Sequence, residues 1–208
     1  GKEARHSNQA VADALQAGGA KKGLPAHTVQ LVGTTDREAI RELVQMEGRV
    51  DLAIPRGGEG LIRAVTDNAR IPVIKHYKGV CHVYVHAAAD RDMALRIIEN
   101  AKCQRPGVCN AIEKVLVDAS IANEFLPALA RLMAERKVEL RGDDAARAIV
   151  ASMKVATEED WTAEYLDLIL TVKVVPGLQA AIDHINRYGS RHSDTIVTGD
   201  ELAGKEFC

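Results

Sequence analysis

The chain has few aromatic residues and almost no net charge. Phenylalanine, tyrosine and tryptophan make up 3% of its 208 residues, which leaves little material for the stacking platforms that bind single-stranded nucleic acid. Lysine and arginine number 27 against 29 aspartate and glutamate residues, so a formal net charge of −2 argues against an electrostatic grip on nucleic acid. Its uncharged apolar runs are far shorter than the roughly 20 residues that span a bilayer. Nucleic-acid-binding and membrane-spanning proteins are therefore disfavoured.

The small number of cysteines, and the spacing of the cysteines and histidines, argue against metal and redox centres. The four cysteines include no C-x-x-C pair and are too few for a disulfide scaffold: Cys81, Cys103, Cys109 and Cys208. If the extended backbone expected from His82 continues to His86, four rises of about 3.3 Å separate these histidines too far to share one ion. No secretory apolar segment opens the chain. We therefore expect a soluble, cytoplasmic protein without a metal site.

Hydrophobic residues make up 47% of the chain, which suffices for a substantial core. The first part alternates helical stripes with short apolar runs rich in β-branched residues, an arrangement typical of βαβ units on a parallel sheet. Parallel strands that are buried on both faces have this continuous apolar pattern. We expect strands over residues 28–32, 50–54 and 72–74.

The alternation then starts again after residue 79. Strands are expected over residues 81–85, 114–117, 138–140, 169–175 and 195–197, with helices between them, whereas residues 141–162 are weakly patterned. The boundary between the two sets falls near residues 75–79. The prediction is an α/β protein with two domains, residues 1–77 and residues 78–208.

A glycine-rich turn follows the expected strand at residues 50–54. Gly57 and Gly58 stand between this strand and a helix start, where glycine lets a backbone approach a phosphate and the helix N-terminus offers free N–H groups. The segment matches neither G-x-G-x-x-G nor the P-loop. By composition alone it is either a phosphate site or an ordinary βα turn.

The loop around Cys109 indicates a functional site more specifically than the glycine-rich turn does. Pro106 and Gly107 break the preceding helix and make a sharp turn just before this cysteine. Arg105 and Lys102 are close in sequence and would favour a reactive thiolate nucleophile. The alternative is a loop cysteine without a role, and these residues alone do not separate the two. Cys103, which ends the apolar helix, is interpreted as packing.

A second polar cluster surrounds a Gly-Ser turn near the C-terminal end. It contains His184, Tyr188, His192 and Ser193, and by itself it is interpreted as a helix end followed by a polar loop. An isolated carboxylate at Glu164, before the expected strand at 169–175, indicates little alone.

Taken together, these segments carry a family resemblance over essentially the whole chain and in order. The matching stretches are Ile54-Pro55-Arg56-Gly57-Gly58, Gly79-Val80-Cys81-His82-Val83-Tyr84-Val85, Gln104-Arg105-Pro106-Gly107-Val108-Cys109-Asn110-Ala111, Glu164-Tyr165-Leu166-Asp167-Leu168, Ala181-Ile182-Asp183-His184-Ile185 and Tyr188-Gly189-Ser190-Arg191-His192-Ser193-Asp194. They resemble the gamma-glutamyl phosphate reductases, the proline-biosynthesis branch of the aldehyde dehydrogenase superfamily. The resemblance implies part of a Rossmann-like parallel-sheet domain that binds NADPH, residues 1–77, followed by an α/β catalytic domain, residues 78–208.

The resemblance also implies a reaction. NADPH-dependent reduction of L-glutamyl 5-phosphate would yield L-glutamate 5-semialdehyde and phosphate through a thioacyl intermediate on Cys109. The backbone N–H of Cys109 would help to stabilise the oxyanion. A cytoplasmic enzyme of a small-molecule substrate, homo-oligomeric at full length, is implied as well.

Site residues follow from the same resemblance. Gly57 and Gly58 fall where the superfamily binds the cofactor pyrophosphate, and Glu164 falls where a glutamate holds the nicotinamide ribose. Lys2 falls where NAD-preferring relatives have a ribose-binding carboxylate, and a cation there would suit the 2′-phosphate of NADPH. Arg105 is the candidate for the substrate phosphate or carboxylate, with a purely structural arginine as its alternative.

Two departures from the superfamily pattern stand out. Residues 75–79 read Lys-His-Tyr-Lys-Gly where hydrolytic members have a Glu-Leu-Gly-Gly-Lys motif with a general base, a loss that suits phosphate rather than water as the partner of the thioacyl group. Family members are also longer at both ends, so the isolated chain is expected to have weak activity or none. The alternatives are the reductase half of a bifunctional pyrroline-carboxylate synthase and an inactive nucleotide-binding fragment.

Overall fold

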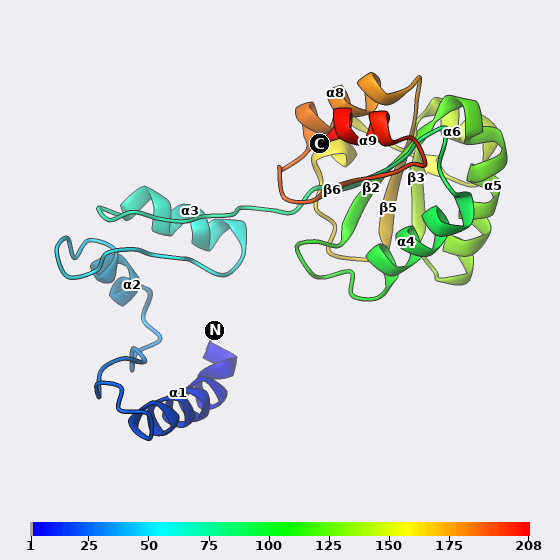
Figure 1. The fold of residues 1–208 in the computed structure, drawn as a ribbon. Coiled ribbons are helices and arrows are strands. Elements are labelled where there is room, and N and C mark those ends of the chain that lie inside the picture. The colour runs from blue at the N-terminus through cyan, green and yellow to red at the C-terminus, as the bar shows by residue number, and fades with distance from the viewer. Residues whose placement is uncertain (1) are drawn as a thin grey trace. The chain divides into compact units, whose positions relative to one another are not determined.

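The computed structural model describes residues 2–208, with side chains from Glu3 onward (Figure 1). The chain separates into two compact units, a first unit of Gly1–Tyr77 and a second unit of Lys78–Cys208. The cofactor and catalytic roles expected of the two domains stay predictions.

The second unit is built on one parallel sheet. Its strands are β1 (Cys81–Val85), β2 (Ile112–Asp118), β3 (Glu139–Gly142), β4 (Lys154–Val155), β5 (Ile169–Val175) and β6 (Asp194–Val197). They form a six-stranded sheet in the order β4-β3-β5-β2-β1-β6, and every pairing is parallel. The α/β class expected from the sequence is thereby confirmed. The expected strand at 169–175 has the observed bounds, and residues 141–162, which were weakly patterned, contain two short helices and the two-residue strand β4.

Helices cover both faces of this sheet (Figure 1). They are α4 (Arg91–Cys103), α5 (Ala119–Glu135), α6 (Asp144–Ile149), α7 (Glu158–Thr162), α8 (Leu178–Tyr188) and α9 (Glu201–Phe207). The larger core packs α4, α5 and α6 against one face, where Val115 and Val117 point. The smaller core packs α8 and α9 against the other, where Leu116 points. Strand residues alternate between two buried faces, as expected for a sheet enclosed by crossover helices.

Aspartates begin most of these helices. Asp90 accepts a hydrogen bond from the backbone N–H of Met93, and Asp118 accepts one from Ser120. Such N-caps satisfy backbone donors that have no partner inside the helix. Asp90 and Asp118 thus fix where α4 and α5 begin.

The first unit is mainly helical. It contains a short 3₁₀ helix η1 (Lys2–Ala4) followed by α1 (Arg5–Ala20), α2 (Arg37–Leu43) and α3 (Glu59–Asn68). A small core of Val44, Val65 and Ile71 holds α3 and the end of α2 together. Asp36 caps α2 by accepting from the N–H of Glu38.

The strands expected in the first unit do not form. Residues 28–32 make no ladder, and the segments 50–54 and 72–74 meet only in an isolated parallel bridge between Ala53 and Val73. Apolar side chains of these segments are exposed, among them Val32, Ile54 and Ile74. The predictions were wrong because a strand needs hydrogen-bonded neighbours, and apolar composition does not supply them. Among the described residues, no helix combines the length and the apolarity required to cross a membrane.

Candidate active site

Four loops of the second unit gather at the amino end of its parallel strands. Gly79 leads into β1, Cys109 into β2, Glu164 into β5 and Ser190 into β6. Because parallel strands start at the same edge of a sheet, residues far apart in sequence meet here. Open α/β sheets more often bind ligands at the carboxyl ends of their strands, so topology alone would have directed attention to the opposite edge.

Cys109 lies on a tight loop between α4 and β2. The N–H of Val108 donates to the carbonyl of Arg105, and the N–H of Ala111 donates to that of Val108. These turns leave the Cys109 residue exposed. Within residues 2–208, no acceptor takes the Cys109 N–H. An exposed thiol next to a free backbone donor has the geometry for attack on a carbonyl carbon.

Gly79 packs directly against the backbone of Cys109. A Cβ atom built on Gly79 would lie 1.8 Å from the Cys109 carbonyl oxygen, a distance that no side chain tolerates. The Cys81 thiol donates to the same oxygen across 3.4 Å. The position of the candidate nucleophile therefore depends on the absence of a side chain at residue 79.

Glu164 reaches the same glycine from the β5 side. Its Oε1 accepts a hydrogen bond from the Gly79 N–H at 2.8 Å. Lys78 supports this approach, because its ammonium donates to the Thr162 carbonyl at 3.0 Å. The structure thus brings Cys109 and Glu164 to one residue, Gly79, although 55 positions separate them in the chain.

The Gly-Ser turn near the C-terminal end completes the cluster. The Ser190 hydroxyl accepts from the Val80 N–H at 2.8 Å, and His192 Nδ1 lies 3.8 Å from the Cys81 sulfur. Asp194 binds the next residue of β1, with its Oδ1 2.9 Å from His82 Nδ1. The interpretation as an ordinary helix end missed that this loop lies beside the Cys109 loop, and only the motif match contained a signal for it.

The neighbouring cysteines are chemically distinct from Cys109. Burial, with a contribution from the Asp194 carboxylate, raises the pKa of Cys81 to about 11. Burial also raises the pKa of Cys103, which packs against the larger core as its sequence predicts. Little of the Cys81 thiol is therefore ionised near neutral pH, so it is a poor competitor for electrophiles.

Alkylation rates provide a direct check of this difference. We expect iodoacetamide to label the exposed Cys109 well before Cys81 and Cys103 between pH 7 and pH 9, because only thiolates that solvent can reach react. Cys81 should react only as the pH approaches 11. The measurement is the labelling rate of each cysteine-containing peptide by mass spectrometry across pH. Preferential labelling of Cys81 would contradict the assignment of Cys109 as the reactive thiol.

Of the two cations expected beside Cys109, Lys102 and Arg105, the structure turns Lys102 away from it. The Lys102 ammonium is buried and pairs with the buried Glu113 carboxylate at 2.9 Å, so it does not face the thiol. That expectation was wrong because Lys102 lies on the inward face of α4. Arg105 lies on the Cys109 loop with an exposed side chain, and its contact with a substrate stays a prediction.

In the first unit, the glycine-rich turn stands immediately before α3. Gly58 is the N-cap of this ten-residue helix, and Gly57 has a φ of +153°, a conformation that L side chains rarely adopt. A Cβ atom on Gly57 would also lie 2.7 Å from the Leu61 side chain. The turn leaves its backbone bare at a helix N-terminus, which is the arrangement that binds phosphate.

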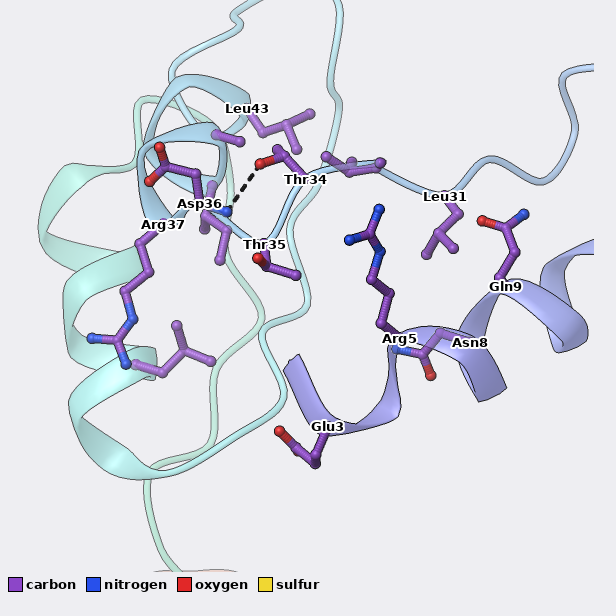
Figure 2. A pocket seen from close by; sticks show the side chains of 15 residues that line it. Glu3, Arg5, Asn8, Gln9, Leu31, Thr34, Thr35, Asp36, Arg37 and Leu43 are labelled. Atoms are coloured by element: carbon purple, nitrogen blue, oxygen red, sulfur yellow. Dashed lines mark hydrogen bonds between the residues drawn. The ribbon is translucent and has the colours of Figure 1, made fainter.

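The first unit also contains a cavity of about 680 Å³. It lies between the start of α1, residues 31–36 and α2 (Figure 2), and its volume is typical of sites for small molecules and cofactors. Figure 2 shows the Arg5 side chain reaching from α1 into this space, near Thr34 and Thr35. Gly57 and Gly58 are not among its lining residues.

Lys2, the residue expected at a cofactor 2′-phosphate, is in η1, and its side chain lies outside the described part of the chain. Its neighbours Glu3 and Arg5 do line the cavity. Arg5 is therefore a cavity cation that the sequence reasoning missed. The position of an arginine at the start of an amphipathic helix contained no signal for this role.

Comparisons with known proteins agree with this arrangement. The aldehyde dehydrogenase family model matches residues 3–198. The chain belongs to the aldehyde dehydrogenase family. Membership implies a nicotinamide cofactor. Curated relatives named gamma-glutamyl phosphate reductase are 53% identical in Citrifermentans bemidjiense and 54% identical in Desulfatibacillum aliphaticivorans, each over the whole chain.

Two solved structures show the same fold. A gamma-glutamyl phosphate reductase from Thermotoga maritima is 42% identical over 99% of this chain, with a TM-score of 0.92. Glyceraldehyde-3-phosphate dehydrogenase GapN from Methanocaldococcus jannaschii is 16% identical, with a TM-score of 0.73. The match covers all of this chain and 54% of the GapN chain, and it shows a shared fold only. The chain spans about half the length of the reductases it matches, 50% in each of the three named here.

Proposed function

We propose that the protein containing this chain reduces L-glutamyl 5-phosphate to L-glutamate 5-semialdehyde and phosphate with NADPH, and that Cys109 is its nucleophile. The relatives that match over the whole chain have the name of this activity. The observation that supports the proposal best is the convergence of Cys109 and Glu164 on Gly79. Cys109 provides the nucleophile, and Glu164 provides a carboxylate for the cofactor ribose. Both contact the same residue, Gly79.

In the proposed reaction, the Cys109 thiolate attacks the acyl carbon of the acyl phosphate. The new carbon–sulfur bond forms as the carbon–oxygen bond to phosphate breaks, and phosphate leaves with the electron pair. The free N–H of Cys109 is a donor for the oxyanion that develops on the carbonyl oxygen. Covalent attachment divides a difficult reduction into two easier steps.

The residues of the first unit fit a nicotinamide dinucleotide. The bare turn at Gly57 and Gly58 is suited to the pyrophosphate, and the nearby cavity has room for the adenosine end. When bound, the reduced cofactor supplies the hydride that converts a thioester into an aldehyde. Glu164 Oε1 accepts from the Gly79 N–H, and the other carboxylate oxygen of Glu164 would bind the nicotinamide ribose. The resemblance supports Lys2 as the cation for the 2′-phosphate.

Preference for NADP⁺ over NAD⁺ tests the Lys2 assignment. We expect Lys2→Ala to raise the KM for NADP⁺ at least tenfold and to leave the KM for NAD⁺ unchanged, because a charged hydrogen bond to phosphate contributes about 1.5–3 kcal/mol. Arg5→Ala is the matched variant, since Arg5 lines the cavity. If only Arg5→Ala changes the preference, Arg5 rather than Lys2 recognises the 2′-phosphate.

The decisive assay is phosphate-dependent reduction of NADP⁺ with glutamate 5-semialdehyde, which runs the proposed reaction backwards. Arsenate and phosphate should both support turnover, whereas omission of the anion should abolish it. Turnover without phosphate would indicate hydrolysis of the thioacyl group and would contradict the proposed acyl-phosphate chemistry. The assay uses the complete protein in which this chain occurs, and weak or absent activity is expected when the chain is isolated.

A further inference from the structure

The carboxylate of Glu164 is positioned by a segment that has no regular structure of its own. Residues 163–168 connect α7 to β5, and buried side chains of β2 hold their backbone. The Lys114 ammonium donates to the Ala163 carbonyl at 2.8 Å, directly before Glu164. Two residues after it, the Leu166 N–H donates to Glu113 Oε1 at 3.3 Å.

An irregularity in β2 makes this possible. In the β1–β2 pairing, Cys81 faces Ile112 but His82 faces Lys114, so Glu113 is an extra residue. Neighbouring residues of a regular strand point to opposite faces, whereas a bulge redirects them. Here both side chains are buried and contact the same segment. Bulges of this kind occur frequently beside active sites, where they aim side chains.

Glu113 also connects the segment to the Cys109 loop. Its second oxygen accepts from the Lys102 ammonium at 2.9 Å, and Lys102 lies in the last turn of α4, just before that loop. Both carboxylate oxygens of Glu113 are therefore engaged. One buried carboxylate therefore links the segment that contains the candidate ribose ligand to the end of α4, from which the Cys109 loop starts.

Tyr165, within the segment, anchors it to its surroundings through its ring and its hydroxyl. Its ring centre lies 4.6 Å from the Lys114 ammonium, and its hydroxyl bonds Asp160 at 2.6 Å and Thr171 at 2.7 Å. The next residue, Leu166, has a φ of +54°, a conformation that costs energy for a side chain of this kind. Such backbone persists only where surrounding contacts determine it.

The contacts of Glu113 and Lys114 with residues 163–168 do more than fill the core. A buried ion pair is weak evidence for stability, because apolar residues of similar volume usually do as well. Apolar residues, however, could not bond the carbonyl and the N–H on either side of Glu164. We propose that Glu113 and Lys114 are positioning residues that hold the Glu164 carboxylate in place for the nicotinamide ribose. The inference rests on the proposed function for the identity of that ligand.

The test is a double-mutant cycle in the complete protein, with the KM for NADP⁺ as readout. Glu164→Ala and Lys114→Met should each raise this KM about tenfold, and the double variant should be no worse than Glu164→Ala alone, because Lys114 acts through Glu164. The KM for glutamate 5-semialdehyde and the iodoacetamide labelling rate of Cys109 should stay unchanged. Burial lowers the pKa of Lys114, so replacing it by methionine removes a cation that is costly to bury. The ion pair between Glu113 and Lys102 remains, so the variant should fold.

Tyr84→Phe is the matched control. It removes a buried hydrogen bond, to Asp118 at 3.0 Å, from the opposite end of β1 and β2. It should alter stability without altering the KM for NADP⁺. Should Lys114→Met fail to fold, Tyr165→Phe releases the same segment from its other side and should raise the KM in the same way.

Hydrogen exchange gives a readout that does not require activity. The Gly79 N–H is bonded to Glu164, so its exchange should speed up about tenfold in Lys114→Met and stay unchanged in Tyr84→Phe. Unchanged Gly79 exchange in Lys114→Met, or additive effects on KM, would overturn the inference. If Glu164→Ala raises the KM but Lys114→Met does not, the inference alone is wrong. If Glu164→Ala leaves the KM unchanged, the role proposed for Glu164 is wrong, and the inference fails with it.

Discussion

Phosphate-dependent NADP⁺ reduction should fall by a factor on the order of 10⁴ or more when Cys109 is replaced by alanine. The loss follows because no other group in the cluster can form the thioester. Cys81, the nearest thiol, is buried with its pKa raised to about 11, and its hydrogen bond is directed at the Cys109 carbonyl. The measurement is the rate of NADPH formation from glutamate 5-semialdehyde, together with a mass search for an acyl adduct on the enzyme.

Cys208→Ala serves as the control for this experiment. Cys208 is an exposed residue that follows α9, with its N–H bonded to the Gly204 carbonyl, and its replacement should leave the rate unchanged. NADP⁺ binding should survive in Cys109→Ala. A variant that retained more than a few per cent of the rate would refute Cys109 as the nucleophile.

Gly79→Ala has the second largest expected effect. Its new methyl group would lie 1.8 Å from the Cys109 carbonyl oxygen, so the backbone of one loop must move. We expect a loss of about 2–3 kcal/mol in the free energy of unfolding, as for overpacked cores. Activity should fall about 100-fold, since a displacement of about 1 Å at a reacting group costs that much. Chemical denaturation and the NADP⁺ assay measure the two losses.

Gly107→Ala is the comparison variant on the nucleophile's own loop. A Cβ atom there meets its nearest neighbour, the Leu166 carbonyl oxygen, at 3.9 Å, which is ordinary contact. Stability should change by no more than about 0.5 kcal/mol. If both glycines tolerated alanine equally, the close approach of Gly79 to Cys109 would have no functional importance.

The strands of the two units show what local sequence can predict about this fold. Residues 169–175 form a continuous apolar run and are the strand β5, with neighbours β3 and β2 on its two sides. Residues 28–32 have the same apolar, β-branched character, yet they form no ladder. Composition indicates which segments prefer extended backbone. Whether such a segment becomes a strand depends on hydrogen-bonded neighbours, which lie far away in the sequence.

Candidate site residues divide in a similar way. Cys109 could be found locally, because Pro106 and Gly107 mark a constrained turn around a thiol. Glu164 stood out only through the family motif, since an isolated carboxylate has no local signature. Lys102 shows the opposite error: its proximity to Cys109 in sequence suggested an electrostatic role, but the helix turns it inward onto Glu113.

The sequence by itself determined the family, the α/β class and the identity of Cys109 as the residue to test, because these depend on short motifs and on local periodicity. The tertiary structure decided what surrounds that residue. It placed Gly79 against the Cys109 carbonyl, turned the Glu164 carboxylate onto the Gly79 N–H, and used an extra residue in β2 to direct Glu113 and Lys114 toward one segment. Parallel strands bring their amino ends together whatever their separation along the chain, and strand register determines which side chains then meet.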